Sequence, residues 1–152
     1  MTYKIYTDGS SNQGNVSKEN RKGGWAYLIM DDKEIIVDEQ SGLEIERPTN
    51  NQCELLAVIN GLKKTKELSV KGFIEVYSDS AYVVNAFEHA WIETWLKNGW
   101  KNSLGEPVVN KELWVELIDL IKTSKARFNK VKRKSNVFSK RVDELARAKM
   151  RS

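Results

Sequence analysis

The sequence predicts an α/β domain built on a mixed β-sheet. Three strand-like runs near the N-terminus are separated by short turns, which is typical of an antiparallel meander. Further along, the order strand, helix, strand indicates a parallel crossover. The length of 152 residues suits one domain with one hydrophobic core.

The first part of the chain carries the expected meander. Tyr3–Asp8 and Trp25–Met30 have the β-branched and aromatic composition of strands. Asp31 and Asp32 are typical of a turn, after which Ile35–Val37 begins a third strand. The polar segment 12–22 between the first two strands contains Lys18, Arg21 and Lys22, and is interpreted as a solvated insertion rather than a mobile flap.

A long helix follows the meander. Thr49 and Gln52 have the spacing of a capping box, and apolar residues recur at helical spacing from Leu55 to Leu62. After this helix the pattern predicts a strand at Phe73–Ser78, a helix opened by Asp79–Ser80, a short helix at Trp91–Leu96, a helix containing Leu113–Ile121, a strand at Ala126–Val131, and a last helix containing Phe138–Ala146.

Composition and charge restrict the class of protein. The chain is 40% hydrophobic and 30% charged, and it has no apolar run long enough to span a bilayer and no recognisable signal peptide. Its one cysteine, Cys53, excludes an intrachain disulfide, which favours a cytoplasmic location. Residues 122–152 contain twelve Lys/Arg against two acids, so this end of the chain is suited to a polyanion, unless the charges form only a solvated helix face.

Three acidic residues occupy positions where a structural and a chemical role compete. Asp8 closes the first expected strand, Asp79 ends the fourth, and Glu54 lies near the start of the long helix. Each has a structural explanation, as a turn residue, a helix cap or a partner of the helix dipole. If the strands are parallel neighbours, however, the acids meet at one edge of the sheet. Their repulsion would then require a hard cation such as Mg²⁺ or Mn²⁺.

The motifs around these acids resemble those of type I ribonuclease H. The resemblance rests on Asp8-Gly9-Ser10, on TNNQCEL from Thr49 to Leu55, and on Ser78-Asp79-Ser80. The tryptophan-rich stretch WIETWLKNGWK, residues 91–101, is similar to the basic protrusion of that family, and PVVNKELW, residues 107–114, continues the likeness. RVDELAR, residues 141–147, is similar to the last motif of the family, which supplies a fourth acid. The likeness covers nearly the whole chain, and its motifs occur in the family's order.

The resemblance implies a fold, a site and a substrate. The expected fold is ribonuclease H-like, with a five-stranded mixed sheet flanked by helices, in a single catalytic domain spanning residues 1–152 without an N-terminal hybrid-binding domain. The implied catalytic and metal-binding residues are Asp8, Glu54, Asp79 and Asp143. The resemblance also implies a pocket for a DNA phosphate at Arg47, Thr49 and Asn110, and contacts to the 2′-hydroxyls of the RNA strand from Ser11, Asn50 and Asn51, together with Asn12 or Asn15. Tyr82, Trp91 and Trp95 complete the expected substrate-binding set.

The implied reaction is hydrolysis of the RNA strand of an RNA–DNA hybrid, with 5′-phosphate and 3′-hydroxyl products. Two Mg²⁺ ions ~3.5–4 Å apart, with Mn²⁺ as an alternative, would activate the water and stabilise the leaving oxygen. The chain has a single histidine, His89, so no Ser–His or Cys–His pair is expected to act as nucleophile. We expect a monomer.

The tryptophans of the protrusion have two interpretations. Trp91, Trp95 and Trp100 have a spacing that places rings near a DNA strand, where stacking tolerates any base. Tryptophans spaced four residues apart are more often part of a core. We expect Trp91 to contact DNA, and leave Trp95 and Trp100 open between packing and binding.

The sequence departs from the family in the loop before Asp143, which looks shorter than usual and lacks the family's histidine. Residues 131–141 carry Lys132, Arg133 and Lys134 instead. We predict that Lys134 takes roughly the missing position, where it attracts the scissile phosphate or helps to expel product, and that turnover is slower. Three alternatives remain open: a hybrid-binding protein with weak or lost catalysis, another nuclease of the same fold acting on DNA, and an acidic ion-binding structural protein.

Overall fold

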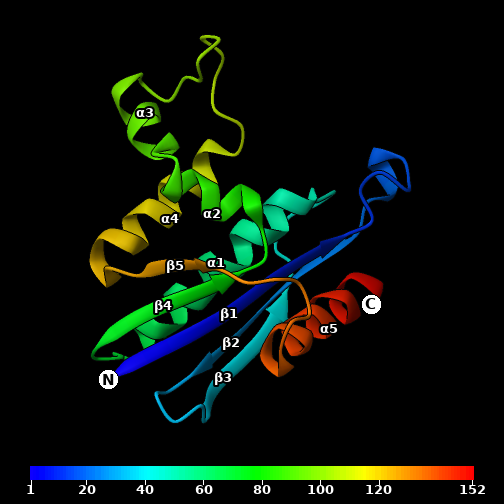
Figure 1. Ribbon diagram of the computed structural model, residues 1–152. Coiled ribbons are helices and arrows are strands. Elements are labelled where there is room, and N and C mark those ends of the chain that lie inside the picture. The colour runs from blue at the N-terminus through cyan, green and yellow to red at the C-terminus, as the bar shows by residue number, and fades with distance from the viewer.

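The computed structural model describes residues 1–152 and contains a five-stranded mixed sheet with the strand order β3-β2-β1-β4-β5 (Figure 1). β1 pairs antiparallel with β2, and β2 pairs antiparallel with β3. On its other side β1 pairs parallel with β4, which pairs parallel with β5. The strands are β1 (Thr2–Ser11), β2 (Gly23–Met30), β3 (Ile36–Gly42), β4 (Phe73–Ser78) and β5 (Arg127–Lys130). The predicted meander and parallel crossover are therefore confirmed.

Helices cover both faces of this sheet. The first face carries α1, with α4 packed beside it, and the opposite face carries α5 (Figure 1). The helices are α1 (Asn50–Glu67), α2 (Ala81–Glu88), α3 (Trp91–Lys97), α4 (Lys111–Ser124) and α5 (Val137–Arg151), with a short 3₁₀ helix, η1 (Lys18–Asn20), between β1 and β2. No helix combines the length and the hydrophobicity that crossing a membrane requires.

The alternation of side chains along β1 divides the core into two parts. Ile5 packs with the cluster beneath α1, whereas the next residue, Tyr6, packs with the cluster beneath α5. Ser10, two pleats after Tyr6, faces α5 as well and donates a hydrogen bond to the sulfur of Met150 at 3.4 Å. Asp8 therefore shares the α5 face of β1 with Tyr6 and Ser10.

β1 is longer than the sequence predicts. The expected end at Asp8 is wrong, because the antiparallel pairing with β2 continues as far as Ser11, which lies opposite Gly23. Only the parallel pairing stops here: β4 ends at Ser78, opposite Thr7. Asp8 is thus an interior residue of its strand that loses its neighbour on one side, and this opening is where other side chains approach it.

Two glycines allow helices to lie directly against this part of the sheet. A Cβ atom at Gly9 would come within 2.5 Å of the backbone of Cys53 and Glu54 in α1. On the other face, a Cβ atom at Gly24 would come within 2.7 Å of the carbonyl oxygen of Ala146 in α5. Only glycine permits both approaches. Because glycine has a low preference for strands, the sequence predicts β-structure least clearly where the two helices approach the sheet most closely.

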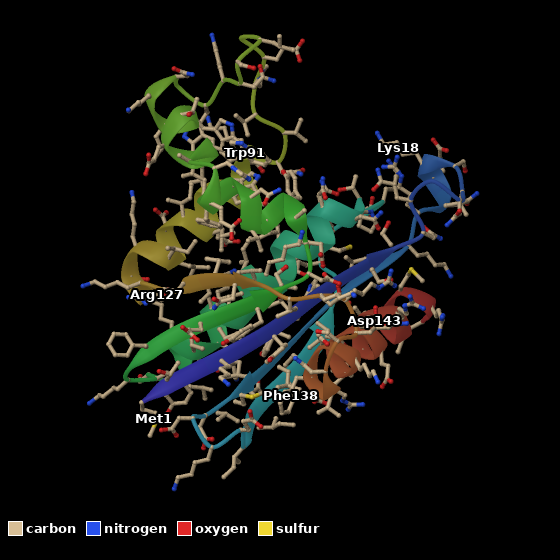
Figure 2. All side chains as sticks on the ribbon, viewed as in Figure 1. Met1, Lys18, Trp91, Arg127, Phe138 and Asp143 are labelled. Carbon is tan, nitrogen blue, oxygen red and sulfur yellow. The ribbon has the colours of Figure 1, made fainter.

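A protrusion formed by α3 and the loop that follows extends away from the sheet (Figure 1). Its base is anchored by aromatic packing, since the Trp95 ring lies 5.3 Å from Trp114 of α4 and 6.0 Å from Trp100. Trp91 is 38% exposed on the protrusion (Figure 2). The structure places Trp95 and Trp100 in packing contacts and leaves the Trp91 ring accessible.

We expect Gly9→Ala to lower the free energy of unfolding by about 3 kcal/mol, because the new methyl group meets helix backbone rather than a flexible side chain. Urea denaturation measures the loss. Gly14→Ala is the control: Gly14 has a φ of +92° and no atom within 4 Å of an added Cβ, so only backbone strain of about 1 kcal/mol is expected. Equal losses in the two variants would contradict the close approach at Gly9.

Candidate active site

The side-chain oxygens of Asp8, Glu54 and Asp79 lie within 4.8 Å of one another. Three different elements supply them. Asp8 lies on β1, Glu54 lies in the first turns of α1, and Asp79 directly follows β4. The parallel register that pairs Thr7 with Ser78 brings Asp79 beside Asp8, and the absent side chain of Gly9 lets the backbone of α1 bring Glu54 to the same point.

The carboxyl groups of Asp8 and Glu54 are buried in a way that disfavours their charge. Asp8 is 6% exposed, and burial, reinforced by the charge of Asp79, raises the pKa of Asp8 to about 7. Burial and then the charges of Asp8 and Asp79 raise the pKa of Glu54 well above its usual value. The backbone N–H of Gly9 donates to Oδ1 of Asp8 at 2.9 Å and offsets only part of this cost.

The donor set fits a hard divalent cation. The Oε1 atom of Glu54 is buried without any hydrogen-bond partner, a costly state for a carboxylate oxygen. No lysine or arginine forms an ion pair with Asp8, Glu54 or Asp79, so the protein itself supplies no neutralising charge. All the offered ligand atoms are oxygens, which Mg²⁺ and Mn²⁺ prefer.

Asp143 joins the three acids from the opposite face. It lies on α5, is 4% exposed, and lines a cavity of about 410 Å³ together with Asp8, Glu54 and Asp79 (Figure 2). Its charge is one of the causes that raise the pKa of Asp8. The structure therefore brings together all four acids that the family resemblance implied, with Asp143 outside the tightest group of three.

The same cavity contains polar residues that sequence analysis assigned to the RNA strand. Ser11, Asn50 and Asn51 line it, and no apolar side chain does. The backbone N–H of Asn50 donates to the side-chain oxygen of Gln13 at 2.8 Å, which joins α1 to the segment after β1. Gln13 had no distinguishing signal in the sequence.

Asn12 and Asn15 differ from these residues. The Asn12 side chain accepts a hydrogen bond from the backbone N–H of Lys22 at 2.7 Å and donates to the carbonyl oxygen of Asn20 at 3.4 Å. Asn12 thus closes the β1–β2 connection. Asn15 is exposed in the same connection and does not line the acid cavity. The β1–β2 connection extends away from the acids, with Lys18 distant from Asp143 (Figure 2).

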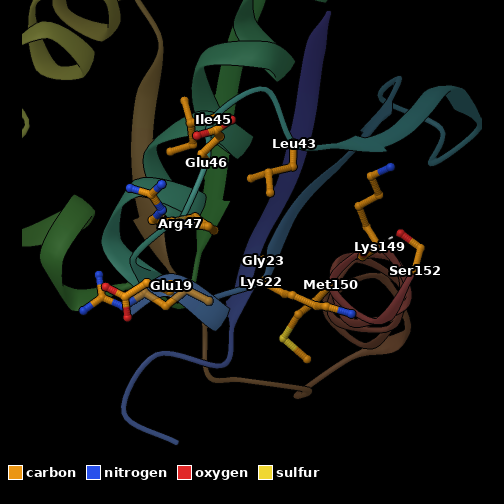
Figure 3. A pocket seen from close by; sticks show the side chains of 12 residues that line it. Glu19, Lys22, Gly23, Leu43, Ile45, Glu46, Arg47, Lys149, Met150 and Ser152 are labelled. Atoms are coloured by element: carbon orange, nitrogen blue, oxygen red, sulfur yellow. Dashed lines mark hydrogen bonds between the residues drawn. The ribbon is translucent and has the colours of Figure 1, made fainter. Parts of the chain in front are cut away.

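The expected phosphate pocket is divided between two places. Thr49 forms the predicted capping box with Gln52, and the Gln52 side chain also donates to Oδ1 of Asn110 at 3.3 Å. Tyr82 accepts hydrogen bonds from Asn110 and Trp114 and extends this network. Arg47 instead lines a separate cavity of about 550 Å³ between the segment after β3 and the end of α5 (Figure 3).

The loop before α5 places two basic residues differently. Arg133 lines the acid cavity, with a guanidinium nitrogen 3.5 Å from Oδ1 of Asp143. Lys134 lies 3.5 Å from Oδ2 of the same residue but lines a neighbouring cavity. The sequence pattern favoured Lys134 over Arg133, because the spacing of adjacent loop residues does not show on which side of Asp143 each one lies.

Neither Cys53 nor His89 is suited to nucleophilic catalysis in this region. Cys53 is buried, and burial raises the pKa of its thiol to about 12. His89 is the C-cap residue of α2 and stacks against Trp91 at 6.0 Å, outside the acid cavity. The chemistry of the site is therefore that of its carboxylates.

The sheet order and the acid cluster define the class of ribonuclease H-like α/β proteins. The family model described as RNase H matches residues 1–151, and this chain belongs to that family. The ribonuclease H of Chlorobaculum parvum is 43% identical over 152 residues, covering 96% of this chain and 93% of the relative. The ribonuclease H of Acetivibrio thermocellus is 47% identical over 146 residues, with coverages of 93% and 90%.

Solved structures share the fold at lower identity. LC11-RNase H1 in complex with an RNA/DNA hybrid superposes with a TM-score of 0.72 at 24% identity, covering 98% of this chain and 96% of that one. LC9-RNase H1, described as a type 1 RNase H with the type 2 active-site motif, gives a TM-score of 0.81 at 22% identity, with coverages of 98% and 72%. These similarities confirm the predicted ribonuclease H-like fold.

Without divalent ions, we expect the protein to lose stability as the pH rises from about 4 to about 7. The folded state raises the pKa of Asp8 from 3.8 to about 7, so it binds a proton more tightly than the unfolded chain, and this advantage disappears when the proton leaves. The raised pKa of Glu54 acts in the same direction. Thermal unfolding in EDTA at several pH values measures the effect.

Asp8→Asn is expected to weaken this pH dependence, and Mg²⁺ to stabilise the wild type at pH 8 far more than the variant. Asp119→Asn, at an exposed position on α4, is the matched control and is expected to behave as wild type. A pH dependence unchanged by Asp8→Asn would show that the acid cluster does not carry the repulsion.

Proposed function

We propose that this protein is a ribonuclease H that hydrolyses the RNA strand of RNA–DNA hybrids with two Mg²⁺ ions held by Asp8, Glu54, Asp79 and Asp143. One observation carries the proposal: carboxylates from β1, α1, the end of β4 and α5 converge on a single cavity. Membership of the RNase H family supports the same activity. The expected products carry 5′-phosphate and 3′-hydroxyl ends.

The proposed roles of the acids follow from their positions. Asp8 is central, since it lies within reach of both Glu54 and Asp79 and is affected by the charge of Asp143. Bound divalent ions supply Lewis-acid activation of water and neutralisation of charge at the reacting phosphate. The four carboxylates bind and orient, and none of them needs to attack the phosphate.

Recognition of the hybrid is proposed to use the two sides of α1. Ser11, Asn50 and Asn51 line the acid cavity and offer hydroxyl and amide groups to the 2′-hydroxyls of the RNA strand. Thr49 and Asn110, joined through Gln52, offer polar groups to a phosphate of the DNA strand. The substrate roles of Asn12, Asn15, Arg47, Tyr82, Trp91 and Trp95 stay predictions, and Trp91 has the most accessible ring of the predicted aromatic contacts.

We also propose that residues 1–152 act as one catalytic domain, because the sheet and its two helical layers form one body around the site. We propose a monomer, because one chain supplies all four acids of the cavity. The alternative of a hybrid-binding protein without catalysis is disfavoured by the unpartnered Oε1 of Glu54. Buried, mutually repelling carboxylates lower stability unless they bind a cation. The alternative of a nuclease acting on DNA is tested by comparing cleavage of hybrid and of duplex DNA.

We expect Asp8→Asn to lower kcat for hybrid cleavage by about 1,000-fold while hybrid binding is retained, because one carboxylate ligand is lost. Labelled hybrid, duplex RNA and duplex DNA are incubated with Mg²⁺ or Mn²⁺, and the product ends are mapped. Asp119→Asn is the control. If the wild type binds the hybrid without cleaving it, the protein is a hybrid-binding protein without catalysis. If it cleaves duplex DNA but not the hybrid, it is a nuclease that acts on DNA.

We expect Arg133→Ala to lower kcat/KM by about tenfold, since a guanidinium that lines the acid cavity can contact the scissile phosphate. Lys134→Ala tests the residue that sequence analysis preferred, and a smaller decrease is expected because its side chain lines the neighbouring cavity. Steady-state kinetics on one hybrid compares the variants. An unchanged rate and affinity in Lys134→Ala would remove any role for that residue.

A further inference from the structure

A basic groove runs along the exposed side of α5, next to the acid cavity. It has a volume of about 300 Å³, and none of the residues that line it is hydrophobic. Asp143 lines both the groove and the acid cavity, so the two adjoin at this residue. The residues that line this α5 groove are Lys134, Lys140, Asp143, Glu144, Arg147 and Arg151.

The α5 groove has an excess of positive charge that the protein does not neutralise. Asp143 is already within 3.5 Å of Arg133 and Lys134 and within 3.3 Å of Arg147. Lys140 and Arg151 are exposed and form no ion pair. By contrast Arg141, on another side of the same helix, is paired with Glu39 at 2.5 Å. The groove therefore keeps two cations that no acid of the protein neutralises.

The spacing of these cations forms a straight line. Lys140, Arg147 and Arg151 are seven and four residues apart, so they lie on one face of the helix. Eleven residues of helix rise by about 16 Å, which is long enough to lie along several consecutive phosphates of one strand. A row of cations of which the two outer ones, Lys140 and Arg151, form no ion pair is the electrostatic pattern of a nucleic-acid backbone site.

We propose that the α5 groove binds the sugar–phosphate backbone of the RNA strand as that strand leaves the acid cavity. This inference rests on the proposed function, because it takes the strand in the acid cavity to be RNA. The DNA strand is assigned to the side of Thr49 and Asn110, where α1 and α4 meet. The groove lies along α5, which covers the face of the sheet opposite α1, and it adjoins the acid cavity at Asp143. Its occupant is therefore the cleaved strand.

The test compares a hybrid with flush ends and the same hybrid carrying an unpaired RNA extension at its 5′ or its 3′ end. A fourth substrate carries the extension on the DNA strand. The variant Lys140→Gln/Arg151→Gln removes the two unpaired cations and keeps long polar side chains. Its matched control, Lys66→Gln/Lys71→Gln, removes two exposed cations near the far end of α1. The measurement is kcat/KM over a range of salt concentrations.

For the wild type and the control we expect an RNA extension at one end to raise kcat/KM above that of the flush hybrid. Lys140→Gln/Arg151→Gln is expected to lose this gain. Its kcat on the flush hybrid is expected to stay at the wild-type value, because neither side chain lines the acid cavity. The slope of log kcat/KM against log salt on the extended substrate falls by about 1.4, the value for two single-strand phosphate contacts.

Several results would overturn the inference. These are the absence of a gain from either RNA extension, a gain that survives in Lys140→Gln/Arg151→Gln, an equal loss in the control, and a gain from the DNA extension alone. If the wild type cuts the flush hybrid, each of these results removes the groove and leaves the proposed function intact. If the wild type fails to cut the flush hybrid with either metal, the proposed function fails, and the assignment of the groove to RNA fails with it.

Discussion

Repulsion between buried carboxylates is the constraint on which the rest of this structure depends. Asp8, Glu54 and Asp79 lie close together in a region where burial raises the pKa of Asp8 to about 7. Two features of the backbone bring these repelling carboxylates together. β4 ends opposite Thr7, one residue before Asp8, and the missing side chain of Gly9 lets α1 lie directly against β1. A cluster held together against its own charge is poised to gain stability from a divalent cation.

The helix on the opposite face completes the site and balances its charge. Asp143 adds a fourth carboxylate, yet it differs from the other three because Arg133, Lys134 and Arg147 surround it. Negative charge is therefore concentrated in the cavity, and positive charge begins directly beyond it along α5. Such a boundary suits a phosphodiester chain, which must approach the ions at one point and be held by cations on either side.

Much of the local structure could be predicted because its signals are local. The capping box at Thr49, the strand at Phe73–Ser78 and the amphipathic pattern of the last helix are confirmed, since each depends on neighbouring residues. The end of β1 was predicted wrongly because its last residues pair with β2, a partner distant in sequence. The separation of Arg47 from Thr49 likewise depends on backbone geometry, with Arg47 at a φ of 50°.

The sequence by itself determined the order of strands and helices, the family and the identity of the four acids, because these follow from periodicity and from motifs read in order. Only the tertiary structure decided which groups meet. It placed Arg133 rather than Lys134 in the acid cavity, packed Trp95 against Trp114, and aligned Lys140, Arg147 and Arg151 of α5 beside Asp143. The physical reason is that electrostatic and packing energies depend on distances in space, and residues far apart in the chain acquire those distances only when the sheet register and the helix contacts are formed.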